Sequence, residues 1–249
     1  MNNDYVLTKL RAYDFTDIYH VFQPQLNLLK NSIDRAEILT RWKTKENIFI
    51  NPGEFIEIAE QNNLIWLLDL FSLEKALRFS KDNKIKISTN FSIKTLERLT
   101  LMSDINKILS QFNYNYDFSF ITIEITETVD PTDIIILKKN ISELKKMGIK
   151  FVLDDFSIKF ANLKAISEYP ITGLKIDSSV IKILNFENGE NVLSAFCLFL
   201  QSLNINIIFE GVEKAFEVDF LRKNMSKNFF IQGFYISKPL LEEDFLSII

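Results

Sequence analysis

Six apolar runs, each closed by a polar side chain, constrain the fold of this chain more than any other feature. The runs are KIKISTN, SFITIEITE, IKFVLDD, ITGLKID, INIIFE and FFIQG, and helical patterns separate them. A strand that helices cover on both faces has this unbroken apolar pattern. Strands that alternate with helices predict right-handed βαβ units in one parallel sheet. The 249 residues of the chain suit one (β/α)8 barrel, which typically has about 250 residues.

The segment from Ile18 to Trp42 differs from these runs because only a short turn separates its two apolar strands. Strands joined by so short a connection lie antiparallel. We therefore expect an α/β fold, a TIM-like (β/α)8 barrel whose first strand runs antiparallel to the rest. We expect one domain over residues 1–249, with an N-terminal extension or helix over 1–17 and the barrel over 18–249. Farther along, DPTD predicts Asp130 as the N-cap of a helix that begins at Pro131.

The composition of the chain excludes several classes of protein. The formal net charge is −4, and the absence of a lysine or arginine stripe argues against a nucleic-acid polymer as partner. No apolar run approaches the ~18 residues of a membrane-spanning helix, and the amino terminus lacks an apolar signal segment. We therefore expect no membrane span and a cytoplasmic location. The one cysteine, Cys197, rules out an intramolecular disulfide and a cysteine-rich metal site.

Polar side chains at the ends of the predicted strands are the main functional signal. In a (β/α)8 barrel, the carboxyl ends of the strands meet at the face that carries the active site. The residues at these ends are Asn90, Glu124, Asp154, Asp155, Lys175, Glu210 and Gln232, and the antiparallel hairpin adds Glu37. Carboxylate and amide oxygens are the ligands that Mg²⁺ and Mn²⁺ prefer. The pattern therefore predicts a divalent-metal site.

The adjacent pair Asp154 and Asp155 makes that prediction more specific. Neighbouring carboxylates repel each other unless cations neutralise them, and one carboxylate that bridges two ions about 3.5–4 Å apart serves in-line phosphoester displacement. Lys175 could orient or deprotonate a water molecule, or neutralise charge in the transition state. Taken singly, each strand-end acid could instead be a helix N-cap or a surface ion pair, and Lys175 could be the partner of a carboxylate. The residues alone support a barrel with a divalent-metal site that could act on phosphate esters.

The order of short segments resembles the EAL domain family, the bacterial phosphodiesterases specific for cyclic di-GMP. AEILTRW is similar to the Glu-Ala-Leu motif that names the family, with Ile38 in place of the alanine. FQPQ resembles the opening Tyr-Gln-Pro strand of the family, and NPGEFIEIAEQNNLI resembles its Pro-X-X-Phe-Ile-X-X-Ala-Glu helix. STNFS, IEITET, VLDDF, LKIDSS, FEGVEK and QGFYISKPL then match the remaining motifs in order. The resemblance runs from about Tyr19 to the carboxyl terminus.

The resemblance implies a site with two Mg²⁺ or Mn²⁺ ions that hydrolyses cyclic di-GMP to linear pGpG and lowers the level of this second messenger. It implies that Glu37, Asn90, Glu124 and Asp154 hold the first ion, and that Asp154, Asp155 and Glu210 hold the second. Lys175 would serve the nucleophilic water, with Glu37 and Glu210 as its catalytic partners. The implied substrate contacts are Arg41 at a phosphate and Gln23 and Gln232 along the nucleotide. Asp177 and Glu127 would be supporting residues.

The loop after the aspartate pair departs from the family pattern. The family has Asp-Asp-Phe-Gly-Thr-Gly, whereas this chain has DDFSIK, so Ser157 and Lys159 replace glycines and Ile158 replaces a threonine. Glycine permits a positive φ that other residues adopt only at a cost. We therefore expect a changed loop over residues 157–162, in a region that in the family contributes to dimer contacts. Such changes around metal ligands typically lower activity or metal affinity 10–100-fold.

Three functions follow from these observations. The first is an active cyclic-di-GMP phosphodiesterase, which in the family can form a homodimer through the region after Asp155. The second is a weak or inactive EAL protein that acts as a cyclic-di-GMP receptor or binds a regulatory protein partner. The third is another metal-dependent phosphoesterase on a similar barrel.

Overall fold

The computed structural model describes residues 2–112, 117–126, 132–157, 166, 169–227 and 229–249. These residues form two compact units, which are described separately below. Unit 1 consists of residues 1–22, 38–123 and 129–149, and unit 2 consists of residues 23–37, 124–128 and 150–249. The expectation of one domain over residues 1–249 stays a prediction.

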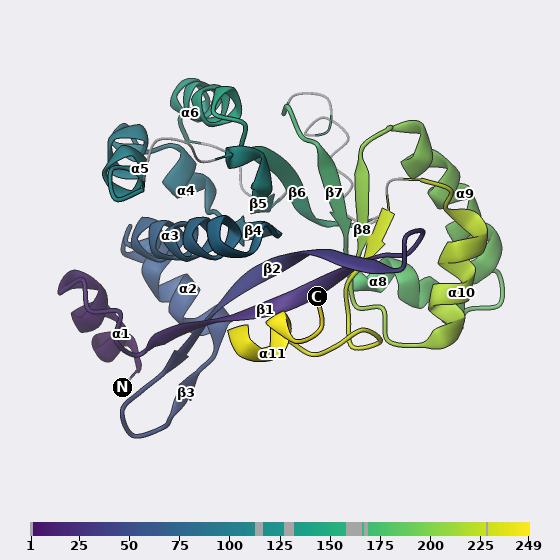
Figure 1. Ribbon diagram of the computed structural model, residues 1–249, viewed down its shortest axis with the longest axis horizontal. Helices are drawn as coiled ribbons and strands as arrows, with labels where there is room; N and C mark the ends of the chain where they lie inside the picture. The colour runs from purple at the N-terminus through teal and green to yellow at the C-terminus, as the bar shows by residue number, and fades with distance from the viewer. Residues whose placement is uncertain (1, 113–116, 127–131, 158–165, 167–168, 228) are drawn as a thin grey trace. The chain divides into compact units, whose positions relative to one another are not determined.

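Nine strands of the described chain form one sheet. They are β1 (Ile18–Asn27), β2 (Ser32–Lys43), β3 (Phe49–Ile50), β4 (Lys86–Asn90), β5 (Ile121–Thr126), β6 (Lys150–Phe156), β7 (Gly173–Ile176), β8 (Asn206–Phe209) and β9 (Phe229–Ile231). Their order is β1-β9-β8-β7-β6-β5-β4-β2-β3, and a further pairing of β1 with β2 closes a ring of eight strands (Figure 1). Strands β6 to β9 pair in parallel, whereas β1 pairs antiparallel with β9. The predicted barrel with an antiparallel first strand is confirmed.

Unit 1 carries the helices of the first half of the chain. They are α1 (Asn2–Arg11), α2 (Pro52–Gln61), α3 (Ile65–Asn83), α4 (Ile93–Leu96), α5 (Leu101–Leu109), the short 3-10 helix η1 (Phe118–Phe120) and α6 (Ile134–Lys146). Val6 and Leu10 of α1 belong to one buried apolar cluster with Trp42 of β2 and Phe55 of α2. Residues 2–11 of the segment expected to be an extension or helix therefore form a helix that contributes to the core.

Helix α6 begins later than its sequence predicts. The carboxylate of Asp133 accepts hydrogen bonds from the backbone N–H groups of Ile135 (3.1 Å) and Ile136 (3.0 Å), so that Asp133 is the N-cap. A helix has one N-cap, and Asp133 satisfies the first unpaired N–H groups of this one. The predicted start at Pro131 is wrong, and Asp130 and Pro131 themselves lie outside the described residues.

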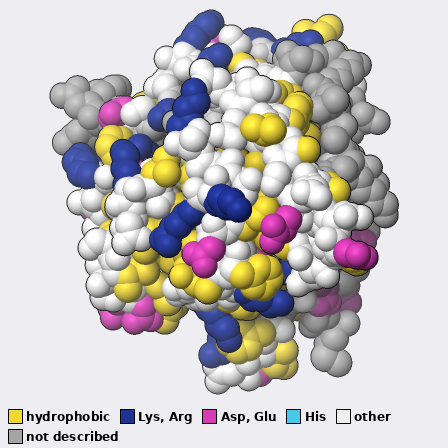
Figure 2. Space-filling view, turned by 90° about the vertical axis from the view of Figure 1, so that its right-hand side faces the viewer, with side chains coloured by type: hydrophobic (Ala, Val, Ile, Leu, Met, Phe, Trp, Pro, Cys, Tyr) yellow, Lys and Arg dark blue, Asp and Glu magenta, His cyan; other side chains and the backbone are white. Residues whose placement is uncertain are grey.

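Unit 2 carries α8 (Ser178–Ile181), the 3-10 helix η2 (Lys182–Asn185), α9 (Gly189–Ser202), α10 (Ala215–Asn224) and α11 (Glu242–Leu246). Helices α9 and α10 pack side by side, and the Gln201 side chain donates to the Asn224 carbonyl at 2.9 Å. On the face that lies to the right in Figure 1, hydrophobic side chains are interspersed with charged ones (Figure 2). None of the described helices is both long and apolar enough to cross a membrane.

The strands of unit 2 point a row of polar side chains in one direction. Val152, Ile208 and Phe230 form a buried apolar cluster on β6, β8 and β9. Side chains two residues apart lie on the same face of a strand, and the residues two positions farther along these three strands are Asp154, Glu210 and Gln232. The apolar cluster therefore forms a layer directly before the polar strand ends, and polar groups converge at the carboxyl edge of the sheet.

Candidate metal centre

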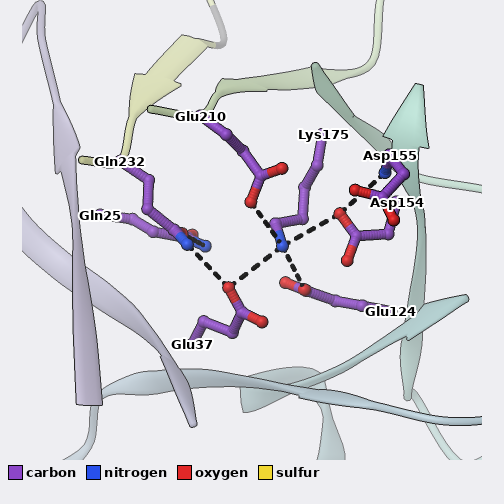
Figure 3. Close-up of polar contacts among 8 residues, drawn as sticks. All are labelled: Gln25, Glu37, Glu124, Asp154, Asp155, Lys175, Glu210 and Gln232. Atoms are coloured by element: carbon purple, nitrogen blue, oxygen red, sulfur yellow. Dashed lines mark hydrogen bonds and ion pairs between the residues drawn. The ribbon is translucent and has the colours of Figure 1, made fainter. Parts of the chain in front are cut away.

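Four carboxylates surround the side chain of Lys175 in unit 2. Lys175 lies on β7 and is 1% exposed. Its Nζ atom lies 3.1 Å from Glu37 Oε2, 2.7 Å from Glu124 Oε2, 3.0 Å from Asp154 Oδ1 and 2.9 Å from Glu210 Oε1 (Figure 3). These side chains come from four further strands or strand ends. Residues as far apart in the sequence as Glu37 and Glu210 therefore meet at one ammonium group.

Backbone hydrogen bonds hold the strand ends of this cluster. Glu210 directly follows β8, and its N–H donates to the Ile176 carbonyl at 3.0 Å. Gln232 directly follows β9, and its N–H donates to the Phe209 carbonyl at 2.8 Å. The sheet ladder therefore continues one residue beyond each strand, and these side chains project from rigid backbone.

A bulge in β6 explains how two consecutive aspartates reach the same site. Leu153 pairs with Leu174 and Phe156 with Ile176, so that Asp154 and Asp155 together lie opposite Lys175. Successive side chains of a regular strand point to opposite faces, whereas a bulge redirects the extra residue. Asp155 has a φ of +58°, a conformation that Asp tolerates better than most residues.

The carboxylates form two groups that share Asp154. Glu37, Glu124 and Asp154 each offer an oxygen within 4.8 Å of the others, and so do Asp154, Asp155 and Glu210. This is the arrangement in which one carboxylate can bridge two neighbouring cations. The donors are all oxygen atoms, which suits Mg²⁺ or Mn²⁺ and disfavours softer metals.

Burial and mutual repulsion change the protonation of the cluster. Burial raises the pKa of Glu124 well above its usual value, with Glu37 adding to the effect, and burial also raises the pKa of Asp154. Burial raises the pKa of Glu210 to about 8. Burial alone would lower the pKa of Lys175, but the surrounding carboxylates raise it well above its usual value. Four carboxylates thus share one ammonium, and further positive charge would stabilise them.

One oxygen of the cluster is suited to accept such a charge. Glu124 Oε2 is buried and lies 2.7 Å from Lys175 Nζ, yet no described group donates a hydrogen bond of ordinary geometry to it. A buried carboxylate oxygen without a hydrogen bond is costly. The residues present therefore fit a hard divalent cation.

A chain of two amides leads into the cluster from β1. The Gln25 Nε2 group donates to Gln232 Oε1 at 2.8 Å, and Gln232 Nε2 donates to Glu37 Oε2 at 2.7 Å. Gln25 was not among the residues predicted from the sequence. Its position two residues after Gln23, on the same face of β1, was the available signal. Gln23 itself donates to the Ser237 carbonyl at 2.9 Å.

Four other residues predicted from the sequence are Asn90, Arg41, Asp177 and Glu127. Asn90 is the last residue of β4 and belongs to unit 1, as does Arg41, whose Nη1 donates to the Thr40 carbonyl at 2.9 Å. Asp177 is the N-cap of α8 and accepts from the Ser179 N–H at 3.0 Å. Glu127 lies outside the described residues. The roles predicted for these four residues stay predictions.

Comparison with known proteins places the chain in a family. The EAL domain model matches residues 10–239. The signaling protein YkoW of Bacillus subtilis is 29% identical over 230 residues, which are 90% of this chain and 28% of YkoW. The cyclic di-GMP phosphodiesterase PdeR of Escherichia coli is 27% identical over 225 residues, which are 88% of this chain and 33% of PdeR. The chain spans a third or less of the length of these curated relatives.

A solved structure of the PaMucR phosphodiesterase in complex with c-di-GMP shares the fold. It has a TM-score of 0.81 and 25% sequence identity, and the match covers 97% of this chain and 99% of that one. The match to the family model includes the segments that carry Glu37, Glu124, Asp154, Lys175 and Glu210. The chain therefore belongs to the EAL domain family.

Proposed function

We propose that this chain is a metal-dependent phosphodiesterase that hydrolyses cyclic di-GMP to pGpG and so lowers the level of the second messenger. The observation that carries the proposal is the pair of carboxylate groups that share Asp154 around Lys175. The relatives named as cyclic di-GMP phosphodiesterases support the choice of substrate. The solved complex with c-di-GMP supports it as well.

The two groups would hold two Mg²⁺ or Mn²⁺ ions. Glu37, Glu124 and Asp154 would bind one ion with the help of Asn90, and Asp154, Asp155 and Glu210 would bind the other. When bound, the ions would supply Lewis-acid activation of the phosphate and of a water nucleophile. Arg41 would contact a phosphate of the substrate, and Gln23 and Gln232 would line the nucleotide.

The charge of Lys175 and the exposure of Glu210 suggest different catalytic roles for these two side chains. The raised pKa of Lys175 favours the ammonium form, so Lys175 would donate hydrogen bonds that orient the attacking water and neutralise developing charge. The side chain of Glu210 is 19% exposed, more than those of Glu37, Glu124 and Asp154. This greater exposure suits Glu210 to exchange a proton with solvent.

Incubation of the purified protein with cyclic di-GMP and Mn²⁺ tests the proposal. We expect pGpG from the wild type, and a loss of at least about 100-fold for Glu37→Gln, because removing one catalytic contact typically costs a factor of this size. Glu143→Gln is the matched control, since Glu143 is a partly exposed carboxylate on α6. No turnover by the wild type at high enzyme and metal concentrations would overturn the proposal.

A second function has one observation in its favour. Ser157, which stands where the family has glycine, is buried at the end of β6, so the chain enters the altered loop with a side chain that must be packed. Ile158 and Lys159 lie outside the described residues, as do residues 160–162 of the same loop. A receptor would bind cyclic di-GMP without hydrolysing it, which calorimetry combined with product analysis would detect. A substrate panel with linear dinucleotides would reveal another phosphoesterase activity.

A further inference from the structure

We propose that Gln25 is a positioning residue that fixes the amide of Gln232 and, through it, the carboxylate of Glu37. The inference rests on the proposed function, because it treats Glu37 as a metal ligand. Neither Gln25 nor Gln232 would need to touch the metal or the scissile phosphate for this role. Their task is to hold one ligand oxygen in a set direction.

Two hydrogen bonds in unit 2 run in one direction, from Gln25 to Gln232 and from Gln232 to Glu37. Gln25 and Gln232 are 3% and 7% exposed, and they stand on neighbouring strands because Leu26 of β1 pairs with Ile231 of β9. The amide of Gln25 points at the amide of Gln232, which in turn points at Glu37 (Figure 3). Both hydrogen bonds are short and buried, where an unmade bond is expensive.

The donor and acceptor ends of the two amides follow from the chemistry of the carboxylate. An ionised carboxylate can only accept hydrogen bonds, so Gln232 must turn its NH₂ group toward Glu37. Its carbonyl oxygen then faces Gln25, and Gln25 must present its own NH₂ group. An amide has one donor end and one acceptor end, and therefore a single arrangement satisfies all three residues.

The last acceptor of these hydrogen bonds is the Glu37 carboxylate, which belongs to the candidate metal centre. Glu37 Oε2 takes hydrogen bonds from Gln232 at 2.7 Å and from Lys175 at 3.1 Å. Two donors on one oxygen define the orientation of the whole carboxylate. Groups that orient metal ligands in this way typically contribute 10–100-fold to metal affinity. Without the Gln25 donor, Gln232 Oε1 would lose its buried hydrogen bond, and the contact with Glu37 would have to hold the Gln232 amide without that support.

A double-mutant cycle on Mn²⁺ affinity tests the inference. The variants are Gln25→Met, Gln232→Met and the double variant, since methionine keeps the length of the side chain and removes its hydrogen bonds. We expect Gln25→Met alone to raise the Mn²⁺ dissociation constant about 10-fold, and to have no further effect when Gln232 is already methionine. Additive effects in the cycle would overturn the inference, because they would mean that Gln25 acts independently of Gln232.

Gln201→Met is the matched control for the cycle. Gln201 lies on α9 of the same unit, and its amide donates to the Asn224 carbonyl at 2.9 Å and has no contact with Gln25 or Gln232 among the hydrogen bonds described. We expect the Mn²⁺ affinity of Gln201→Met to stay within twofold of the wild type. As a second measurement, NMR of the Gln232 side-chain NH₂ group should show slow hydrogen exchange that is lost in Gln25→Met. Unchanged exchange would contradict the inference even if no variant bound Mn²⁺.

The outcomes separate the inference from the proposed function. Binding of Mn²⁺ without hydrolysis of cyclic di-GMP by the wild type would refute the phosphodiesterase and leave the cycle valid. Hydrolysis by the wild type, together with unchanged Mn²⁺ affinity in Gln25→Met, would refute the role of Gln25 alone.

Discussion

Replacing Lys175 by methionine removes the ammonium group from among four buried carboxylates and keeps the length of the side chain. Its contacts with these carboxylates span 2.7–3.1 Å. At an effective dielectric constant of about 20, unit charges at these distances attract by about 5–6 kcal/mol each. Desolvation of the charged groups offsets much of this attraction.

The repulsion among the carboxylates that remain in Lys175→Met determines how much the unfolding free energy falls. The ligand oxygens of Glu37, Glu124 and Asp154 lie within 4.8 Å of one another, so each pair of charges repels by at least about 3.5 kcal/mol at the same dielectric constant. In Lys175→Met, these carboxylates must take up protons or a cation. Removing one partner of a buried ion pair typically costs about 3–5 kcal/mol, a large share of the 5–15 kcal/mol by which proteins are usually stable.

Urea unfolding with a metal chelator and with Mn²⁺ measures the effect. In chelator, we expect the unfolding free energy of Lys175→Met to be about 3–5 kcal/mol below that of the wild type. Mn²⁺ should stabilise the variant more than the wild type, because the cation replaces the lost positive charge. Lys182→Met is the control, since Lys182 contacts Glu217 at 3.2 Å and Glu213 at 3.5 Å. Its loss of stability should not be recovered by Mn²⁺.

Two results would refute this reasoning. One is a Lys175→Met variant as stable as the wild type in chelator, which would mean that the carboxylates do not depend on the ammonium. The other is equal stabilisation of both proteins by Mn²⁺, which would mean that a divalent cation does not substitute for the lysine charge.

Three further predictions concern the bulge, a buried acid and a helix cap. Asp155→Gly should keep its stability or gain up to about 1 kcal/mol, because glycine accepts the positive φ, while calorimetry should show the Mn²⁺ stoichiometry falling from two to one. Burial raises the pKa of Asp69 to about 7, so the folded state holds a proton that the unfolded chain releases. The wild-type unfolding free energy should therefore fall between about pH 4 and pH 7 more steeply than that of Asp69→Asn, by up to about 1.4 kcal/mol per pH unit, and equal slopes in urea titrations would contradict this. Asp133→Ala should lower the unfolding free energy by about 1 kcal/mol through loss of the α6 cap, whereas an unchanged urea midpoint would argue against the cap.

Much of the fold follows from local patterns in the chain. Strands β4, β7, β8 and β9 each lie within one of the predicted runs, KIKISTN, ITGLKID, INIIFE and FFIQG. An apolar run that stops at a polar residue is a signal within a few positions of sequence. The same signal led to Glu124, Asp154, Lys175 and Glu210, which unit 2 brings together. Helix α4 was missed because four residues show no period.

Other features depended on contacts between segments far apart in the chain. The sequence marks Lys175 and the carboxylates as strand-end groups, but their distances follow from the pairing of strands across the sheet. Gln25 looks like an ordinary strand residue until Gln232, 207 positions away, supplies its partner. The bulge at Asp155 is likewise set by the register between β6 and β7.

Local patterns account for the alternation of strands and helices, the antiparallel first hairpin and the chemical type of the site, because burial periodicity and strand-end side chains are local properties. The folded arrangement was needed to find that one ammonium contacts four carboxylates, that Asp154 belongs to two groups, and that two amides link Gln25 to Glu37. These are consequences of register and burial, which shift pKa values and direct hydrogen bonds through groups that no local pattern connects.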